Sequence, residues 1–172
     1  MTDSPILKVN LLEIKSLAFK LKAGDMLLLN GMMYTARDQA HARLCELIRQ
    51  GEPLPLELSG AVIYYAGAAA APPHLPIGSI GPTTSSRMDA FTPTLLEHGV
   101  AATIGKGPRS PRVLESIKLH NAPYLCALGG AGALYADCVR SARVVAFPDL
   151  GCEAIRELIV ENFPVVVGAE II

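Results

Sequence analysis

Apolar and polar positions along this chain follow two different periods, which predict strands and helices in alternation. Short apolar runs are typical of buried strands, and they predict strands at residues 6–11, 26–29, 61–65, 100–104, 123–128, 142–147 and 164–167. Apolar residues at helical spacing predict helices at residues 12–21, 35–50, 86–91 and 92–99, from 110 onward and from 133 onward. This alternation is typical of an α/β domain with at least partly parallel strand pairing.

Three local predictions depend on single residues or short segments. Thr35 is expected to be the N-cap of the second helix, with Asp38 near the position of a capping-box acid. The pair Asn30-Gly31 indicates either a hairpin turn or a glycine at the point where a strand leaves the sheet. Residues 151–158 are expected to be helical and to lead into a short strand at 158–161.

Length and composition narrow the class of protein. Residues 1–172 are expected to form a single domain. Hydrophobic residues make up 51% of the chain and charged residues 18%, and this apolar content indicates a covered partner interface. A net charge of -1 gives no basis for binding nucleic acid or an anionic membrane. The apolar run 61–71 is too short to span a bilayer, and residues 1–5 lack signal-peptide features. We therefore expect a cytoplasmic protein.

The four cysteines, Cys45, Cys126, Cys138 and Cys152, show no C-x-x-C spacing. Their gaps are not those of a zinc ribbon or of a ferredoxin-type cluster. In a cytoplasmic protein they are expected to be small buried hydrophobic residues. The chain is therefore not expected to bind a metal or to build an iron–sulfur site of its own.

Residues 81–89, Gly-Pro-Thr-Thr-Ser-Ser-Arg-Met-Asp, are the first candidate for an active site. Four small hydroxyl residues stand in a row after a turn, and Arg87 follows them. The hydroxyl groups and the free N–H groups of a starting helix can all point at one anion, which an arginine can hold with two parallel hydrogen bonds. The alternative is a helix start in which Thr or Ser serves only as the N-cap.

Two further cations stand close to predicted strands. Arg37 lies in the predicted first turn of a helix, where the helix dipole favours an acid, so a ligand would explain it. The alternative is a surface arginine paired with Asp38. His41 lies one turn along and would share a face with Arg37, or it is a packed histidine. Lys106 stands between two glycines at a strand end, which is typical of a ligand-binding charge in α/β folds, although a plain turn lysine has the same pattern.

Three segments together resemble a known family: residues 34–41 (Tyr-Thr-Ala-Arg-Asp-Gln-Ala-His), residues 81–89 and residues 104–107 (Ile-Gly-Lys-Gly). They resemble the β subunit, or C-terminal domain, of the class I iron–sulfur hydro-lyases, fumarase and L-tartrate dehydratase. Residues 151–155 and 163–165 also look like that family. The resemblance implies a swivelling β/β/α domain, with a mixed sheet and flanking helices. It also implies a partner α subunit that holds a [4Fe-4S] cluster, and thus a hetero-oligomer, with a homodimer as the alternative for the isolated chain.

The resemblance further implies roles in hydrating or dehydrating a C4 dicarboxylate, with fumarate to malate as the first choice. Arg37, Arg87 and Lys106 would bind the carboxylates and stabilise the charge that forms when the C–H proton leaves. Thr83 would be the base that takes this proton. The residues that would support these side chains from behind are Asp38, His41 and Thr84. Ser85-Ser86 stands where many relatives would have Ala-Gly, and it adds two hydroxyl groups beside Thr83.

Two hypotheses about function stay open at the level of sequence. The first is a catalytic subunit of a fumarase or tartrate dehydratase that is active only with its α partner. The second is a non-catalytic module that binds a small carboxylate or phosphate in the same pocket, and such a module needs the cations but not Thr83. The sequence does not choose among fumarate, tartrate and a methylated analogue.

Overall fold

A computed structural model gives the fold of this chain and describes residues 6–169. Its strands are β1 (Leu7–Asn10), β2 (Met26–Thr35), β3 (Val62–Tyr64), β4 (Ala102–Gly105), β5 (Tyr124–Cys126), β6 (Val139–Ala146) and β7 (Ile155–Ala169). Its α-helices are α1 (Ile14–Leu17), α2 (Asp38–Gln50), α3 (Thr92–Glu97), α4 (Pro111–His120) and α5 (Gly132–Asp137). Strands and helices alternate through most of the length, and the predicted α/β class is confirmed.

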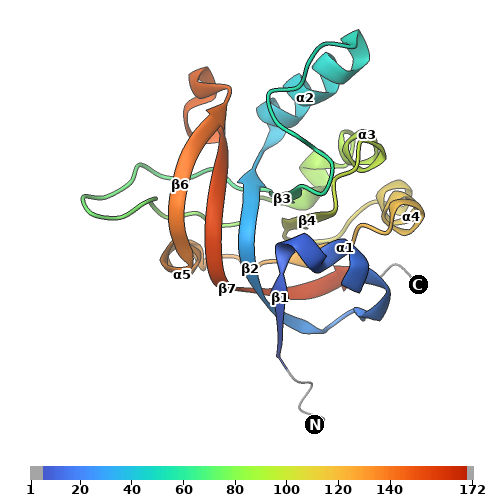
Figure 1. Cartoon of the computed structure of the whole chain (residues 1–172), viewed down its shortest axis with the longest axis horizontal. Coiled ribbons are helices and arrows are strands. Elements are labelled where there is room, and N and C mark those ends of the chain that lie inside the picture. Colours follow the sequence, from blue (N-terminus) through green and yellow to red (C-terminus); the bar gives the residue numbers. More distant parts are fainter. Residues whose placement is uncertain (1–5, 170–172) are drawn as a thin grey trace.

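The first five strands lie side by side in the order β1-β2-β3-β4-β5, and each pair is parallel. Parallel neighbours need a crossover connection, and α2, α3 and α4 lie in the connections between β2 and β5. Figure 1 shows these three helices together on one side of the molecule, away from β6. The carboxyl ends of the parallel strands are therefore followed by loops that lead into helices.

The long strand β7 closes this sheet on itself. It runs antiparallel to β2 along one edge, and to β6 and β5 along the other. The pairings of β2, β3, β4, β5 and β7 thus form a ring, to which β1 and β6 add at the outside (Figure 1). The sheet is mixed, as expected, because the parallel strands meet an antiparallel one.

Alternating side chains divide the interior into two hydrophobic cores. In β3, Val62 and Tyr64 face the core enclosed by the ring of strands, whereas Ile63 faces the core beneath the helices. The second core includes Leu44 of α2 and Ile117 of α4. Since neighbouring residues of a strand point to opposite faces, each ring strand can contribute to both cores.

Both predictions for Asn30-Gly31 are wrong. The strand neither turns nor ends there, because β2 runs on to Thr35. Gly31 has a φ of 120°, and the pairing with β7 shifts between Leu29 and Gly31. Glycine tolerates this backbone conformation, so it forms a bulge that bends the strand without ending it.

Two predicted helices also differ from the structure. Residues 12–21 are helical only in short pieces, since the 3₁₀ helices Leu11–Glu13 and Ala18–Lys20 flank α1. The helix predicted at 151–158 is wrong. A 3₁₀ helix covers Pro148–Glu153 and breaks at Gly151, whose φ is 59° and ψ is -115°. β7 then begins at Ile155, because this part of the chain pairs with β6 on one side and, from Arg156 onward, with β2 on the other.

No helix within residues 6–169 has the length and apolar character that crossing a membrane requires. The expectation about residues 1–5 lies outside the part of the chain that the structure describes.

Candidate active site

The candidate residues follow the carboxyl ends of neighbouring parallel strands. β2 ends at Thr35 and Arg37 comes two residues later, whereas Lys106 comes directly after the last residue of β4. The segment 81–89 belongs to the long connection after β3, the strand between these two. The carboxyl ends of parallel strands meet at one edge of a sheet, where α/β proteins usually bind ligands. The topology therefore brings all three candidate segments to one edge.

Backbone contacts hold the hydroxyl run against the lysine loop. The Thr83 N–H donates to the Tyr65 carbonyl at 2.6 Å, and the Ser85 N–H donates to the Lys106 carbonyl at 2.9 Å. Thr84 and Lys106 also pair as an isolated parallel bridge. These pairings join the loops after β3 and β4 and place the Thr83 backbone close to the lysine segment.

The sequence suggested that the four hydroxyl groups of residues 83–86 all face one anion. The structure shows that they do not. Thr83 is half-buried and Thr84 and Ser86 are exposed, but Ser85 is buried and its hydroxyl lies 2.9 Å from the Tyr124 hydroxyl. The N–H groups of Thr83 and Ser85 are occupied by carbonyl oxygens. The N-cap alternative also lacks support, because Thr84 precedes the 3₁₀ helix Ser85–Met88 without a side-chain cap bond.

Asp38 joins the two candidate arginines. Nε and Nη2 of Arg87 donate to the two carboxylate oxygens of Asp38 at 2.9 and 2.7 Å, and Arg37 Nε lies 3.9 Å from Asp38 Oδ2. The Arg87 side chain is 49% exposed and that of Asp38 is 26% exposed, so the pair stabilises the fold by about 1 kcal/mol at most. Its main effect is geometric, because it holds Arg87 next to Arg37 at the start of α2.

Arg37 precedes α2 and does not lie in its first turn. β2 continues to Thr35 and α2 begins at Asp38, so Arg37 itself stands at the N-cap position with an extended backbone. The prediction that Thr35 is the N-cap is therefore wrong. The Thr35 hydroxyl instead accepts the Arg156 N–H at 3.1 Å within the sheet. Arg37 thus still lies at the N-terminus of α2, where the carboxylates of Asp38 and Glu153 offset its charge.

Glu153 supports Arg37 from the far end of the chain. Its Oε1 lies 3.5 Å from Arg37 Nη2, and its Oε2 accepts the Gln39 N–H at 3.1 Å. A Cβ atom at Gly67 would lie 2.9 Å from Arg37 Nη1, so the chain after β3 packs directly on this guanidinium. Within residues 6–169, Arg37 Nε is buried and has no hydrogen-bond partner. Such an unpaired buried donor fits a side chain that binds an anion.

His41 is a packed histidine that supports the Arg37 backbone. It is fully buried, and its Nδ1 lies 2.8 Å from the Arg37 carbonyl oxygen. A carbonyl only accepts, so Nδ1 carries the proton. Burial lowers the pKa of His41 to about 4, although the hydrogen bond to Arg37 opposes this shift. A shared face with Arg37 is not observed, since the ring points into the core against Tyr65 and Phe91.

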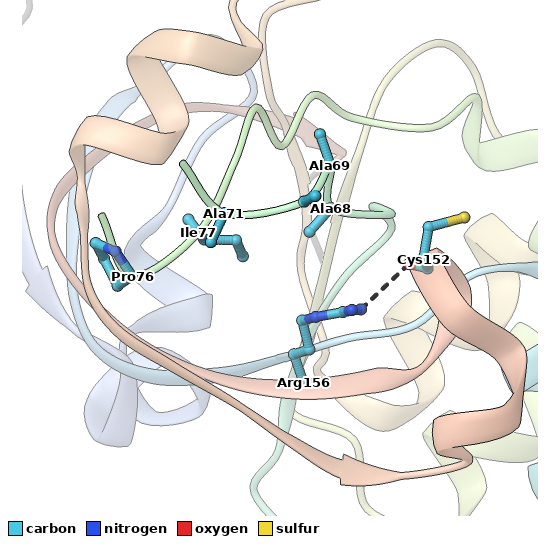
Figure 2. Close-up of a pocket in the computed structure, with 8 residues that line it drawn as sticks. Ala68, Ala69, Ala71, Pro76, Ile77, Cys152 and Arg156 are labelled. Atoms are coloured by element: carbon cyan, nitrogen blue, oxygen red, sulfur yellow. Dashed lines mark hydrogen bonds between the residues drawn. The ribbon is translucent and has the colours of Figure 1, made fainter. Parts of the chain in front are cut away.

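A cavity of about 340 Å³ lies between the alanine-rich loop after β3 and the start of β7, and Arg37, Thr83, Arg87 and Lys106 are not among the residues that line it. Its walls are residues 68–71, Pro76, Ile77, Cys152 and Arg156. Figure 2 shows Arg156 reaching toward the Cys152 carbonyl beneath the alanine-rich loop. The Arg156 guanidinium also donates to the carbonyls of Gly151 and Ala154, each at 3.2 Å. Arg156 therefore shapes the turn that presents Glu153.

Sequence reasoning missed Glu153 and Arg109. Glu153 contacts residues more than a hundred positions earlier, and Arg109 is buried with an ion pair to Asp89 at 2.8 Å. For Glu153 the signal was the likeness of residues 151–155 to the family, which did not say what Glu153 contacts. For Arg109 the signal was a cation inside Pro108-Arg109-Ser110-Pro111, where Ser110 and Pro111 do start α4 as predicted.

The ligand-type side chains of this chain do not fit an iron–sulfur cluster. Cys45 lies in α2, Cys126 in β5, Cys138 after α5 and Cys152 in the 3₁₀ helix Pro148–Glu153. Across the described range 6–169, no three His, Cys, Asp or Glu side chains group in a way that could hold a metal ion. Burial raises the pKa of the Cys45 and Cys138 thiols, which disfavours the thiolate form that metals bind.

This chain is a mixed α/β domain whose candidate cations follow its parallel strands. It matches one family model. The model is described as the fumarase C-terminus and matches residues 2–170. The chain belongs to this family.

The relatives bear the names of hydro-lyases. The chain is 42% identical over 143 residues to fumarate hydratase 2 of Leishmania major, covering 82% of this chain and 25% of the relative. It is also 42% identical over 138 residues to the anaerobic class I fumarate hydratase of Escherichia coli, covering 79% and 25%. It is 39% identical over 157 residues to a putative L(+)-tartrate dehydratase subunit beta of Methanocaldococcus jannaschii, covering 88% and 80%. The chain thus spans about a quarter of the fumarate hydratases but most of the β subunit.

Proposed function

We propose that this chain is the β part of an iron–sulfur hydro-lyase that hydrates fumarate to malate together with an α partner. One observation carries the proposal: Arg37, Arg87 and Lys106 lie in the segments that follow three adjacent parallel strands, and Thr83 lies in the middle one of these segments. Three cations at one sheet edge suit a substrate with two carboxylates. In this proposal residues 1–172 form one swivelling β/β/α domain. Its cytoplasmic location stays a prediction from the sequence.

Each cation has a distinct task in this proposal. Arg87 keeps two nitrogens on Asp38, so it offers its remaining edge to a carboxylate. Arg37 is the second cation at this edge, and within the described part of the chain its buried Nε makes no hydrogen bond and lies 3.9 Å from Asp38 Oδ2. Lys106, on the loop bridged to Thr84, supplies a compact third charge. Charges fixed in advance cost no reorganisation as negative charge grows on the substrate when its C–H proton leaves.

Thr83 is the proposed acceptor of that proton. Its N–H is held by the Tyr65 carbonyl, which fixes the backbone of the loop that also contains Arg87. A threonine hydroxyl is a weak base, and nearby positive charge favours its deprotonated form. Arg87 and Lys106 would therefore serve both the substrate and the base. Asp38, His41 and Thr84 would hold these side chains in place.

The cluster implied by the family would be held by the α partner, because the donor set of this chain does not fit it. Carboxylate binding and proton removal, the two tasks proposed for this chain, would use only its own side chains. The working form would be a hetero-oligomer in which the partner covers the strand-end edge.

A tartrate dehydratase β subunit is the second candidate. The observation that favours it is length, since the match to the relative named as a β subunit covers 80% of that protein. Both candidates use the same cations and the same reaction class, and they differ in the substrate that fits.

The test is to copurify this chain with a cluster-bearing α subunit of the family and to assay fumarate, L-tartrate and mesaconate. We expect turnover with fumarate. Turnover with L-tartrate alone would support the second candidate. No turnover with any of the three would overturn the enzyme proposal. If the chain then still bound these acids in calorimetry, the non-catalytic module would be supported.

Arg87→Ala tests the proposed site within that complex. We expect turnover to be abolished with the fold intact, because the pair with Asp38 contributes little stability. The matched control is Arg140→Ala, since Arg140 is similarly exposed and pairs with Glu161 on β7 at 2.8 Å. A near-normal rate for Arg87→Ala would remove Arg87 from the site.

A further inference from the structure

A buried polar cluster lies directly behind the two loops of the candidate site. Its members are Tyr65, Asp89, Thr92, Arg109 and Tyr124, which we call the polar cluster. They come from the segments after β3 and β4, from α3 and from β5. None of them has a part in the proposed reaction, yet buried polar groups of this kind are costly unless fully bonded. The bonds that satisfy these groups therefore indicate a structural or functional role for the polar cluster.

Arg109 is the centre of the polar cluster. Its side chain is fully buried, with Nε on Asp89 at 2.8 Å, Nη2 on Thr92 Oγ1 at 2.6 Å and Nη1 on the Tyr65 hydroxyl at 3.3 Å. The guanidinium also lies over the rings of Tyr65 and Tyr124, at 5.2 and 5.0 Å. Asp89, the last residue of segment 81–89, also accepts a hydrogen bond of 2.7 Å from the Ser110 N–H. The cluster thus ties the segment after β3 to the segment after β4.

The buried Tyr124 hydroxyl contacts both loops. Its hydroxyl lies 2.9 Å from Ser85 Oγ and 2.7 Å from the Gly107 carbonyl oxygen. A carbonyl only accepts, so Tyr124 donates to Gly107 and its oxygen is left to accept from Ser85. Burial raises the pKa of Tyr124, which keeps this proton in place. The result is a hydroxyl chain from Ser85 through Tyr124 to Gly107.

The two ends of this chain are neighbours of the proposed reacting residues. Ser85 follows Thr83 by two positions, and Gly107 follows Lys106 by one. The backbone pairings of Thr84 and Ser85 with Lys106 also join these two loops. Because Tyr124 comes from β5, it connects both loops to a strand that neither loop contains.

We propose that Tyr124 is a positioning residue that sets the separation of Thr83 and Lys106 through its bonds to Ser85 and Gly107. This inference rests on the proposed function, in which those two side chains act on one substrate. Reaction rates are sensitive to such spacing, because a displacement of about 1 Å can cost on the order of a hundredfold in rate. Arg109 holds the Tyr124 ring from its face and so supports the same alignment.

The first test needs no activity and uses the full chain. Tyr124→Phe removes only the bridging hydroxyl. We expect the Ser85 amide, which is bonded to the Lys106 carbonyl, to exchange its hydrogen at least about fivefold faster, because local opening becomes easier. The Leu44 amide in α2 serves as an internal reference. The matched control is Tyr135→Phe, whose hydroxyl bonds Leu128 N–H and the Pro164 carbonyl. Unchanged Ser85 exchange in Tyr124→Phe would overturn the inference.

The second test uses the complex with the α partner. We expect Tyr124→Phe to lower kcat about tenfold or more with KM changed less than threefold, because alignment and not binding is affected. Ser85→Ala, which cuts the same hydroxyl chain from the loop side, should act in the same direction. The double variant should be no slower than Tyr124→Phe alone, since both changes break one chain. Additive losses, or a kcat equal to that of Tyr135→Phe, would overturn the inference. If the wild-type complex turns over nothing, the proposed function fails while the exchange experiment still decides whether Tyr124 fixes the loops.

Discussion

Asp38 and Arg87 meet through two parallel hydrogen bonds although they stand 49 positions apart in the chain. Asp38 is the first residue of α2, and Arg87 lies in the 3₁₀ helix Ser85–Met88. The bonds use Nε and Nη2, so a substrate carboxylate would bind along the edge that contains Nη1. The sequence assigned Asp38 to the support of Arg37, but in the structure its close partner is Arg87.

Asp38→Asn should weaken substrate binding more than it slows turnover. The amide can accept only one of the two Arg87 bonds, and the ion pair becomes a single hydrogen bond from the guanidinium to a neutral oxygen. We expect KM for fumarate in the complex to rise about tenfold, in line with the loss of one strong hydrogen bond. Asp149→Asn is the control, because Asp149 forms a similar bond pair with Arg43 on the surface. Equal KM values for the two variants would contradict the role of Asp38.

Gly67→Ala should displace Arg37 without removing any charge. The added Cβ would lie 2.9 Å from Arg37 Nη1 and 3.1 Å from the Cys152 carbonyl oxygen. The flexible guanidinium has to move, and the overpacking costs about 1–3 kcal/mol of unfolding free energy. Steady-state kinetics should show a higher KM at a temperature where the variant is folded. Gly24→Ala is the control for lost stability alone, since its Cβ would meet no atom of residues 6–169 within 4 Å and Gly24 precedes the start of β2, at the opposite end of that strand from Arg37. A KM that matches the control would place Arg37 outside the binding edge.

His41 should make the fold less stable in mild acid. Burial lowers its pKa from 6.5 to about 4, so the unfolded chain gains a proton at a higher pH than the folded chain does. The stability contribution is thus fully present above pH 6.5 and is lost as pH falls toward 4, by roughly 3 kcal/mol in total. Urea unfolding of wild type and His41→Gln between pH 4 and 7 measures this difference. A variant with the same pH dependence as wild type would show that His41 is not the group responsible.

Gly31→Ala should destabilise the fold through backbone strain. At a φ of 120° a residue with a Cβ atom is strained, and the expected loss is about 1–3 kcal/mol. Chemical denaturation of the isolated chain measures it. The control Gly129→Ala has no positive φ, so its unfolding free energy should stay close to that of wild type. A stable Gly31→Ala chain would mean that the bulge relaxes at little cost.

Local pattern was sufficient for the parallel part of the fold. Apolar runs such as residues 61–65 predict buried strands because their side chains pack on both faces of a sheet, and β3 forms there. The same reasoning failed for residues 151–158. Their spacing suits a helix, but Ile155 pairs with β6 and the neighbouring Arg156 with both β6 and β2. Tertiary partners decide such segments, and no window of neighbouring residues contains them.

In the candidate site, too, local motifs predicted some features, whereas distant partners decided others. Arg37, Arg87 and Lys106 were predicted from motifs, and the structure places their segments at one sheet edge. The partners that fix these side chains were not predictable, because Glu153 and Arg37 are far apart in sequence and meet only after the ring closes. Ser85 marks the limit of residue type as a guide. It has the hydroxyl that the motif suggested, yet burial turns it toward Tyr124.

The closure of the ring by β7 has a consequence for the speed of folding. The contact between Thr35 and Arg156 spans 121 positions, and β2 gains its long antiparallel neighbour only through such distant pairings. Chains rich in long-range pairings fold slowly, because the entropy of closing large loops is lost before the contacts form. Until β7 docks, one full edge of β2 presents unpaired N–H and C=O groups, the kind of edge at which chains associate wrongly. Docking of β7 therefore closes the sheet, and the fraction of chains that fold correctly depends on this step.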